Sequence, residues 1–245
     1  MDRHTDKREW NKNCRGAAGV LNRLLMLSFC PLLWAGVHML FDGSWCAAAS
    51  SADGAASFWP GILVGYVSGI VLHELAHVCA CLAYGGRVLG GGLMFRYFIP
   101  QVYVNIDWEC VRSRLKRVQI LAAGIECNFA LAGFFLLLLK TGLFSREFLQ
   151  NAATVNFILG VLNTSLADGL DGMQIYEQIL GEENMVRKAR RLLGDRESRR
   201  RLRSRKVNGY AVLLQCYLTV GMQLLLPLYL IFDLLSLCLI GRLAR

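Results

Sequence analysis

Long runs of apolar residues, separated by shorter charged segments, dominate this 245-residue chain. A helix needs roughly 20 mostly apolar residues to cross a bilayer. Residues 24–41, 57–84 and 117–139 meet that requirement, and residues 151–170 form a shorter and more polar fourth candidate. The pattern predicts an α-helical polytopic membrane protein with a three-span core at 57–175 and flanking spans.

Two stretches do not fit a simple upright span. Residues 209–241 are too long for one span and short for two, and Pro227 allows a hairpin of short helices or one long kinked helix. Residues 86–108 contain three consecutive glycines, a β-rich run interrupted by Pro100, and an alternation of apolar and polar residues. This second stretch predicts a small membrane-associated β-hairpin or sheet. Because open sheet edges do not lie in lipid, we expect it at the membrane face or in a protein-lined cavity.

Composition and charge agree with a membrane protein and indicate its orientation. The chain is 55% hydrophobic, which is high for a soluble domain, and its formal net charge is +9. Basic residues are concentrated before the first span, in 85–116 and in 172–206, whereas 42–56 has no lysine or arginine. By the positive-inside rule the N-terminus and both later basic segments are cytoplasmic. We therefore expect a multi-pass protein of the cytoplasmic membrane.

Three features allow alternative readings. The first span resembles a signal peptide with a cleavage site at 47–49, but its long charged leader favours a retained anchor. The arginine run at 187–206 is interpreted as a segment that contacts the bilayer's anionic lipid heads, so no nucleic-acid partner is expected. The nine cysteines include no CxxC pair and most lie in or beside apolar runs, which argues against a disulfide framework.

The stretch VLHELAHVCA, residues 71–80, places ionisable side chains inside the second apolar run. His73 and His77 are four residues apart, so on a helix both imidazoles lie on one face and can reach the same ion. Glu74 lies beside them and can accept a proton from an attacking water. Because ionisable groups inside a span are costly, this H-E-x-x-H pattern predicts a catalytic zinc site rather than a polar pair joining two helices.

A catalytic zinc has three protein ligands, so one more is needed. His4 lies in the charged leader and His38 lies near the far end of the first span, which makes both poor candidates. The fourth run ends in a segment that contains Asp168 and Asp171, and the predicted topology puts both at the depth of the histidines. Either aspartate is a candidate on these grounds alone.

The motifs together resemble the site-2 protease family of intramembrane zinc metalloproteases. The resemblance rests on HELAH, on the spacing from Asn163 to Leu-Asp-Gly at 170–172, and on Ala123-Gly124 with Asn128 in the third span. It covers about residues 57–175. The resemblance implies one Zn²⁺ per chain, with the following roles: zinc ligands His73, His77 and Asp171, general base Glu74, and Asn163 as a residue that positions substrate or the oxyanion.

These expectations define four regions of the chain. Residues 1–56 form a basic cytoplasmic leader, the first span and an external loop, and 57–175 form the catalytic core. Residues 176–206 form a basic cytoplasmic segment, and 207–245 form one or two C-terminal spans. The expected activity is hydrolysis of a peptide bond in a transmembrane helix or membrane-associated polypeptide. The alternatives are a maturase or degrader of small secreted or signalling peptides, and a non-catalytic metal-binding membrane protein.

Overall fold

The computed structural model describes residues 16–34 except 25, 29 and 33, residues 54–166 except 97 and 98, residues 169–181, and the single residues 184, 195 and 197. It divides into two compact units, Met1–Thr164 and Ser165–Arg245, and each is described by itself. The predictions for His4, His38, Asp168, nearly all of 187–206 and all of 209–241 lie outside the described residues.

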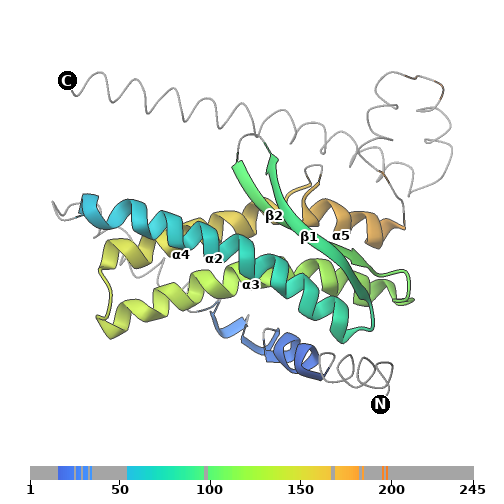
Figure 1. Ribbon diagram of the computed structural model, residues 1–245, viewed down its shortest axis with the longest axis horizontal. Helices are drawn as coiled ribbons and strands as arrows, with labels where there is room; N and C mark the ends of the chain where they lie inside the picture. The colour runs from blue at the N-terminus through green and yellow to red at the C-terminus, as the bar shows by residue number, and fades with distance from the viewer. Residues whose placement is uncertain are drawn as a thin grey trace, which may run out of the picture. The chain divides into compact units, whose positions relative to one another are not determined.

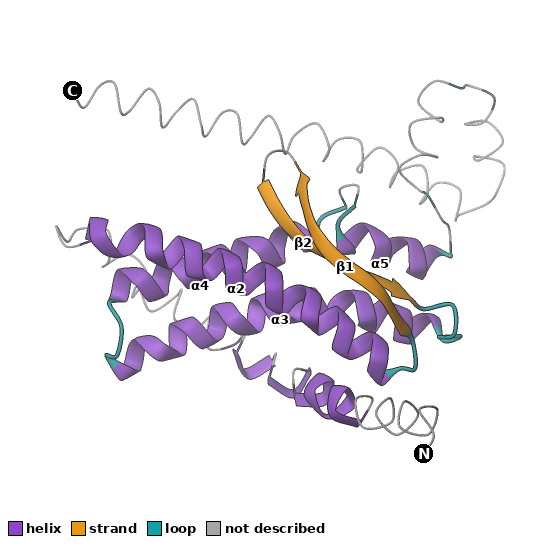
Figure 2. Ribbon diagram, viewed as in Figure 1, coloured by secondary structure: helices purple, strands orange, loops and turns teal. Residues whose placement is uncertain are grey.

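Three helices and one β-hairpin make up most of the first unit (Figures 1 and 2). The helices are α2 (Gly54–Ala83), α3 (Arg114–Leu138) and α4 (Arg146–Thr164), which pack against one another. The hairpin consists of β1 (Arg87–Arg96) and β2 (Ile99–Asp107), paired antiparallel with an irregularity between Val88 and Gly90. The predicted sheet in 86–108 is therefore confirmed, and β2 is the strand that lies along α2.

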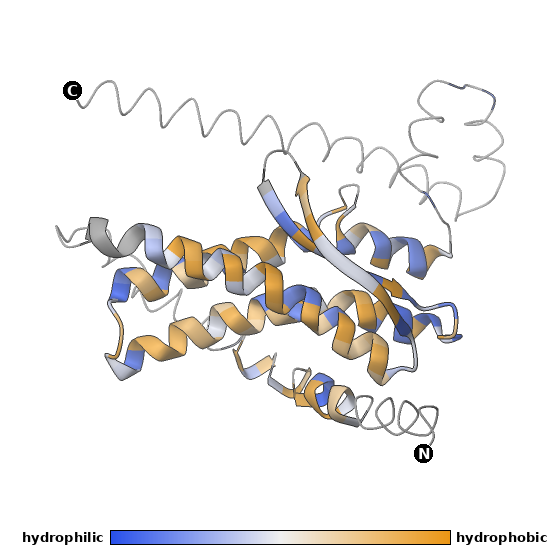
Figure 3. Ribbon diagram, in the orientation of Figure 1, coloured by the Kyte–Doolittle hydropathy of each residue, from blue (hydrophilic) through white to orange (hydrophobic). Residues whose placement is uncertain are grey.

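Two of the described helices are long and apolar enough to cross a membrane. They extend over Trp59–Ala83 and Arg114–Thr141 and agree with the predicted runs at 57–84 and 117–139. Figure 3 shows apolar residues along much of both helices. An N-terminal helical segment, Gly16–Leu32, packs on α3 so closely that a Cβ added at Gly133 would collide with the backbone oxygen of Leu32.

The fourth predicted run, 151–170, has different bounds in the structure. Helix α4 begins at Arg146, where the hydroxyl of Ser145 accepts a hydrogen bond from the Phe148 N–H at 3.3 Å, as a helix-capping residue does. It ends at Thr164, before Gly169 adopts a left-handed φ of 79° that is incompatible with a continuous helix. The prediction was wrong at both ends because it was based on apolar content and did not use the local signals at Ser145 and Gly169.

Small residues on α2 bring it close to α4. A Cβ at Gly65 would lie 2.7 Å from the Cα of Ala152, so the two backbones are in direct contact there. Asn156, which is fully buried, donates from its Nδ2 to the Gly65 carbonyl at 3.0 Å and to the Ala152 carbonyl at 2.9 Å. The close approach and the hydrogen bonds hold α2 and α4 together.

In the second unit the structure describes one helix, α5 (Asp171–Leu180). It begins after Leu170, which has extended dihedral angles, and ends at Gly181 with a left-handed φ of 69°. Met173 is buried against Leu166, Tyr176 and Leu180. Asp171 is thus the first residue of a helix, where the partial positive charge of the N-terminus favours a carboxylate.

Candidate metal centre

Helix α2 brings His73 and His77 together one turn apart on its buried face. Each side chain is 6% exposed, and their Nε2 atoms lie 3.1 Å apart with the ring planes nearly perpendicular. Two nitrogens bound to one tetrahedral zinc at about 2.0–2.1 Å lie roughly 3.3 Å from each other. The separation of the two nitrogens therefore fits a shared metal ion.

The second nitrogen of each imidazole is held by helix α3. His77 Nδ1 lies 2.7 Å from the Ile120 carbonyl oxygen, which can only accept, so Nδ1 donates and Nε2 retains its lone pair. His73 Nδ1 lies 3.0 Å from the amide Nδ2 of Asn128, a side chain that is 1% exposed. Such outer partners fix the tautomer and the orientation of metal-ligating histidines.

The Asn128 amide can present either of its polar atoms to His73. With Nδ2 presented, the amide oxygen Oδ1 is buried without a hydrogen-bond partner. With Oδ1 presented, His73 Nδ1 carries the proton and donates it to the amide, which leaves the lone pair on His73 Nε2. The second orientation gives both histidines the protonation state that a metal requires, so the residues present fit a bound ion.

Gly124 allows helix α3 to approach the histidine pair. A Cβ at this position would lie 2.5 Å from His77 Nε2 and 2.6 Å from His73 Nε2 and Cε1, distances that real Cβ atoms do not show. The absence of a side chain at Gly124 therefore leaves the two lone-pair nitrogens unobstructed. Ala123 and Cys127 are buried on the same helix and complete the apolar surroundings.

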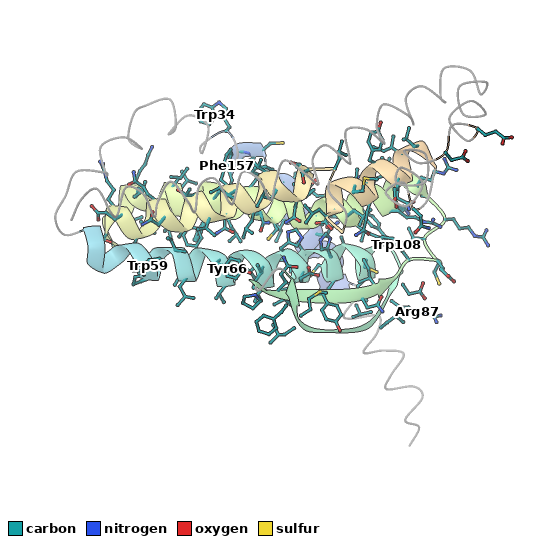
Figure 4. All side chains as sticks on the ribbon, turned by 90° about the horizontal axis from the view of Figure 1, so that it is seen from above. Trp34, Trp59, Tyr66, Arg87, Trp108 and Phe157 are labelled. Carbon is teal, nitrogen blue, oxygen red and sulfur yellow. The ribbon has the colours of Figure 1, made fainter. Side chains whose placement is uncertain are left out.

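Glu74 projects from α2 towards the hairpin. Its side chain is half-buried, and its Oε2 accepts a hydrogen bond from the backbone N–H of Val104 in β2 at 3.0 Å. About two turns towards the helix start, the hydroxyl of Tyr66 donates to the Pro100 carbonyl, also in β2. Figure 4 shows Tyr66 beside the end of the hairpin, whereas Arg87 and Trp108 lie at its base.

The remaining candidates lie on other elements. Asn163 is half-buried in the last turn of α4, in the first unit. Asp171 begins α5 in the second unit, and Asp168 lies outside the described residues. In the first unit the structure thus brings together His73, His77 and Glu74 with their partners on α3 and β2.

Several of these partners carry no sequence signal of their own. Asn128 and Gly124 belong to the motif in the third apolar run, but that motif does not predict which histidine nitrogen each of them lies beside. The Ile120 carbonyl and the Val104 N–H are backbone groups. Every residue type has the carbonyl, and every type except proline has the N–H.

Comparison of the chain with family models, with curated proteins and with solved structures found no match.

Proposed function

We propose that the protein is an intramembrane zinc metalloprotease, of the kind that the site-2 protease family represents. The observation that carries the proposal is the 3.1 Å separation of the two histidine Nε2 atoms, each with its Nδ1 atom held by helix α3. With Asn128 Nδ2 presented to His73, the same 3.1 Å separation is a hydrogen bond from His73 Nε2 to His77 Nε2; with Asn128 Oδ1 presented, both Nε2 atoms keep their lone pairs. In the second orientation the lone pairs converge beside a glycine that leaves room for an ion.

The ligands in this proposal are His73, His77 and Asp171, a group whose donor atoms suit a metal ion. Two imidazoles and one carboxylate are a common ligand set for catalytic zinc, which retains an open position. When bound, zinc lowers the pKa of a water ligand to about 7 and polarises the scissile carbonyl.

The chain's own groups then carry the proton transfers. Glu74 follows His73 directly, accepts the proton of the attacking water and passes it to the leaving amine. Its Oε2 is engaged by Val104, so Oε1 is the atom we assign to that transfer. Asn163, at the cytoplasmic end of α4 in this proposal, donates its amide hydrogens to the substrate or the oxyanion.

The proposed location is the cytoplasmic membrane, with several spans and a cytoplasmic N-terminus. Support comes from the two helices that carry the site, α2 and α3, which are the described helices with the length and apolarity of spans. The substrate class is a transmembrane helix or a membrane-associated polypeptide, because a site on such helices meets its substrate at the depth of the bilayer.

The test uses the full chain purified from membranes in detergent, with zinc measured by mass spectrometry and cleavage of β-casein followed by peptide analysis. We expect about one zinc per chain in the wild type and in Glu74→Gln, because Glu74 is not a ligand. His73→Ala, His77→Ala and Asp171→Ala should lose zinc and activity, and Glu74→Gln should lose activity alone.

Three results would overturn parts of this proposal. Zinc at wild-type occupancy in both histidine variants would remove the metal site. Zinc bound as expected, with no cleavage of β-casein or of membrane-spanning test peptides by the wild type, would favour the non-catalytic metal-binding alternative. Asp171→Ala that still binds zinc and cleaves would move the third ligand to Asp168, for which Asp168→Ala is the matched variant.

A further inference from the structure

Two hydrogen bonds fasten one edge of β2 to helix α2. Tyr66 donates its hydroxyl to the Pro100 carbonyl, and the Val104 N–H donates to Glu74 Oε2 at 3.0 Å. Tyr66 and Glu74 are eight residues apart on a helix, a rise of about 12 Å. Pro100 and Val104 are four residues apart on a strand, a rise of about 13 Å. The match allows the strand to follow the helix with both bonds formed at once.

The backbone groups that make these bonds point away from β1. Residues of an antiparallel strand alternate between groups directed at the partner strand and groups directed at the opposite edge. Pro100, Val102 and Val104 share one parity, so their N–H and C=O groups, where present, face α2 while their neighbours bond to β1. The residue of α2 midway between the two contacts is Ile70, which offers Val102 no side-chain acceptor.

We propose that the Val104 backbone N–H is a positioning group for Glu74, which it orients so that the other carboxylate oxygen, Oε1, serves as the general base. This inference rests on the proposed function. A glutamate side chain has three rotatable bonds, and this hydrogen bond disfavours the orientations in which Oε2 does not face the Val104 N–H. A fixed donor that binds Oε2 narrows the range of positions that the second oxygen, Oε1, can take up. Misplacement of a reacting group by about 1 Å costs up to ~100-fold in rate.

Replacement of Val104 by proline tests the proposal, because proline lacks only the outward N–H at this edge and leaves the β1–β2 ladder its donors. Val102→Pro is the matched control, since it imposes the same ring on the same edge without a carboxylate opposite. With a quenched fluorescent peptide built from the best-cleaved β-casein sequence, we expect kcat to fall about tenfold or more in Val104→Pro. KM and zinc content should change less than about twofold, and Val102→Pro should retain wild-type kcat.

Hydrogen exchange provides a readout that does not depend on activity. In zinc-free protein labelled with ¹⁵N-valine, the Val104 amide should exchange about tenfold or more faster in Glu74→Ala than in the wild type, because it loses its hydrogen-bond acceptor. The Val102 amide should exchange at the same rate in both proteins. If Val104→Pro fails to fold, an ester in place of the Val104 amide removes the same hydrogen without the ring.

Each outcome bears on one proposal. Unchanged kcat in Val104→Pro, or unchanged exchange of the Val104 amide in Glu74→Ala, would overturn the positioning role while the zinc-protease proposal stands. A rise in kcat would also overturn it, since the hydrogen bond would then restrain Glu74 instead of orienting it. Loss of the protease itself is recognised separately, by wild-type cleavage that persists in Glu74→Gln.

Discussion

At the residue scale, the candidate metal centre depends on what is absent from helix α3 as much as on the histidines. His73 and His77 converge because Ile120 and Asn128 hold their Nδ1 atoms, and the convergence stays open because Gly124 has no side chain. A methyl group there would occupy the position of the proposed ion. Gly124 is therefore a requirement of the site and not merely of helix packing.

We expect Gly124→Ala to weaken zinc binding by at least about 10–100-fold, the range typical for disturbance of a metal's supporting residues. The added Cβ would lie 2.5 Å from His77 Nε2, so one or both rings must turn away. Zinc per chain, measured after dialysis against graded chelator, reports the loss. Gly19→Ala is the control, because nothing lies within 4 Å of a Cβ at that helical position. A Gly124→Ala protein with wild-type affinity would contradict the assigned ion position.

At the element scale, helix α2 has two separate tasks. On one side, Gly65 and Gly69 contact α4, and the two histidines face α3. On the other, Tyr66 and Glu74 form hydrogen bonds with β2. The contact with α4 thus lies on the same helix as the candidate metal centre and the bonds to the hairpin. The glycines that set the spacing of α2 and α4 should be sensitive to substitution.

Gly65→Ala should lower the free energy of unfolding by about 1–3 kcal/mol, the usual cost of overpacking. Its Cβ would meet the backbone of Ala152, which cannot move without a shift of α4. Gly69→Ala meets only side-chain atoms of Leu159 and Asn156, and its cost should be smaller. Loss of helical circular dichroism in a mixed-micelle titration with dodecyl sulfate gives both values. Equal stability of Gly65→Ala and the wild type would mean that the two helices are not tightly packed there.

At the scale of the whole molecule, the orientation of the two candidate spans has a direct consequence. If α2 and α3 both cross the bilayer, the base of the hairpin and the turn that follows α3 lie on opposite sides. In that arrangement the positive-inside rule predicts that the basic residues at the base of the hairpin, among them Arg87 and Arg114, face the cytoplasm, while β2 lies alongside α2. The turn at 142–145, which begins at Gly142 with a left-handed φ of 67°, is then external.

Cysteine labelling of intact cells tests this arrangement. In a Cys46→Ser background, the exposed thiol of Cys110 should react with an impermeant maleimide only after lysis. In a Cys46→Ser, Cys110→Ser background, Leu143→Cys should react before lysis, because residue 143 is 73% exposed in the turn. The reverse order would invert the topology, and reaction of both sites from one side would mean that α3 does not span the bilayer.

Much of the architecture could be predicted from local sequence pattern. Apolar runs predicted α2 and α3 to within a few residues, because burial in lipid or core rewards every residue of such a run. The alternation in 86–108 predicted the hairpin for a similar reason, since side chains of a strand alternate between faces. The pairing of His73 with His77 follows from the helical repeat alone.

The tertiary structure decided how those pieces act together. His77 meets a carbonyl 43 residues along the chain, and His73 meets an amide 55 residues along, distances over which no local periodicity operates. The contact between Glu74 and the Val104 N–H depends on how the strand lies on the helix, and a backbone donor has no residue type that identifies it. The sequence by itself therefore determined which residues could carry the chemistry, whereas packing of α3 and β2 on α2 determined their tautomers, orientation and room for an ion.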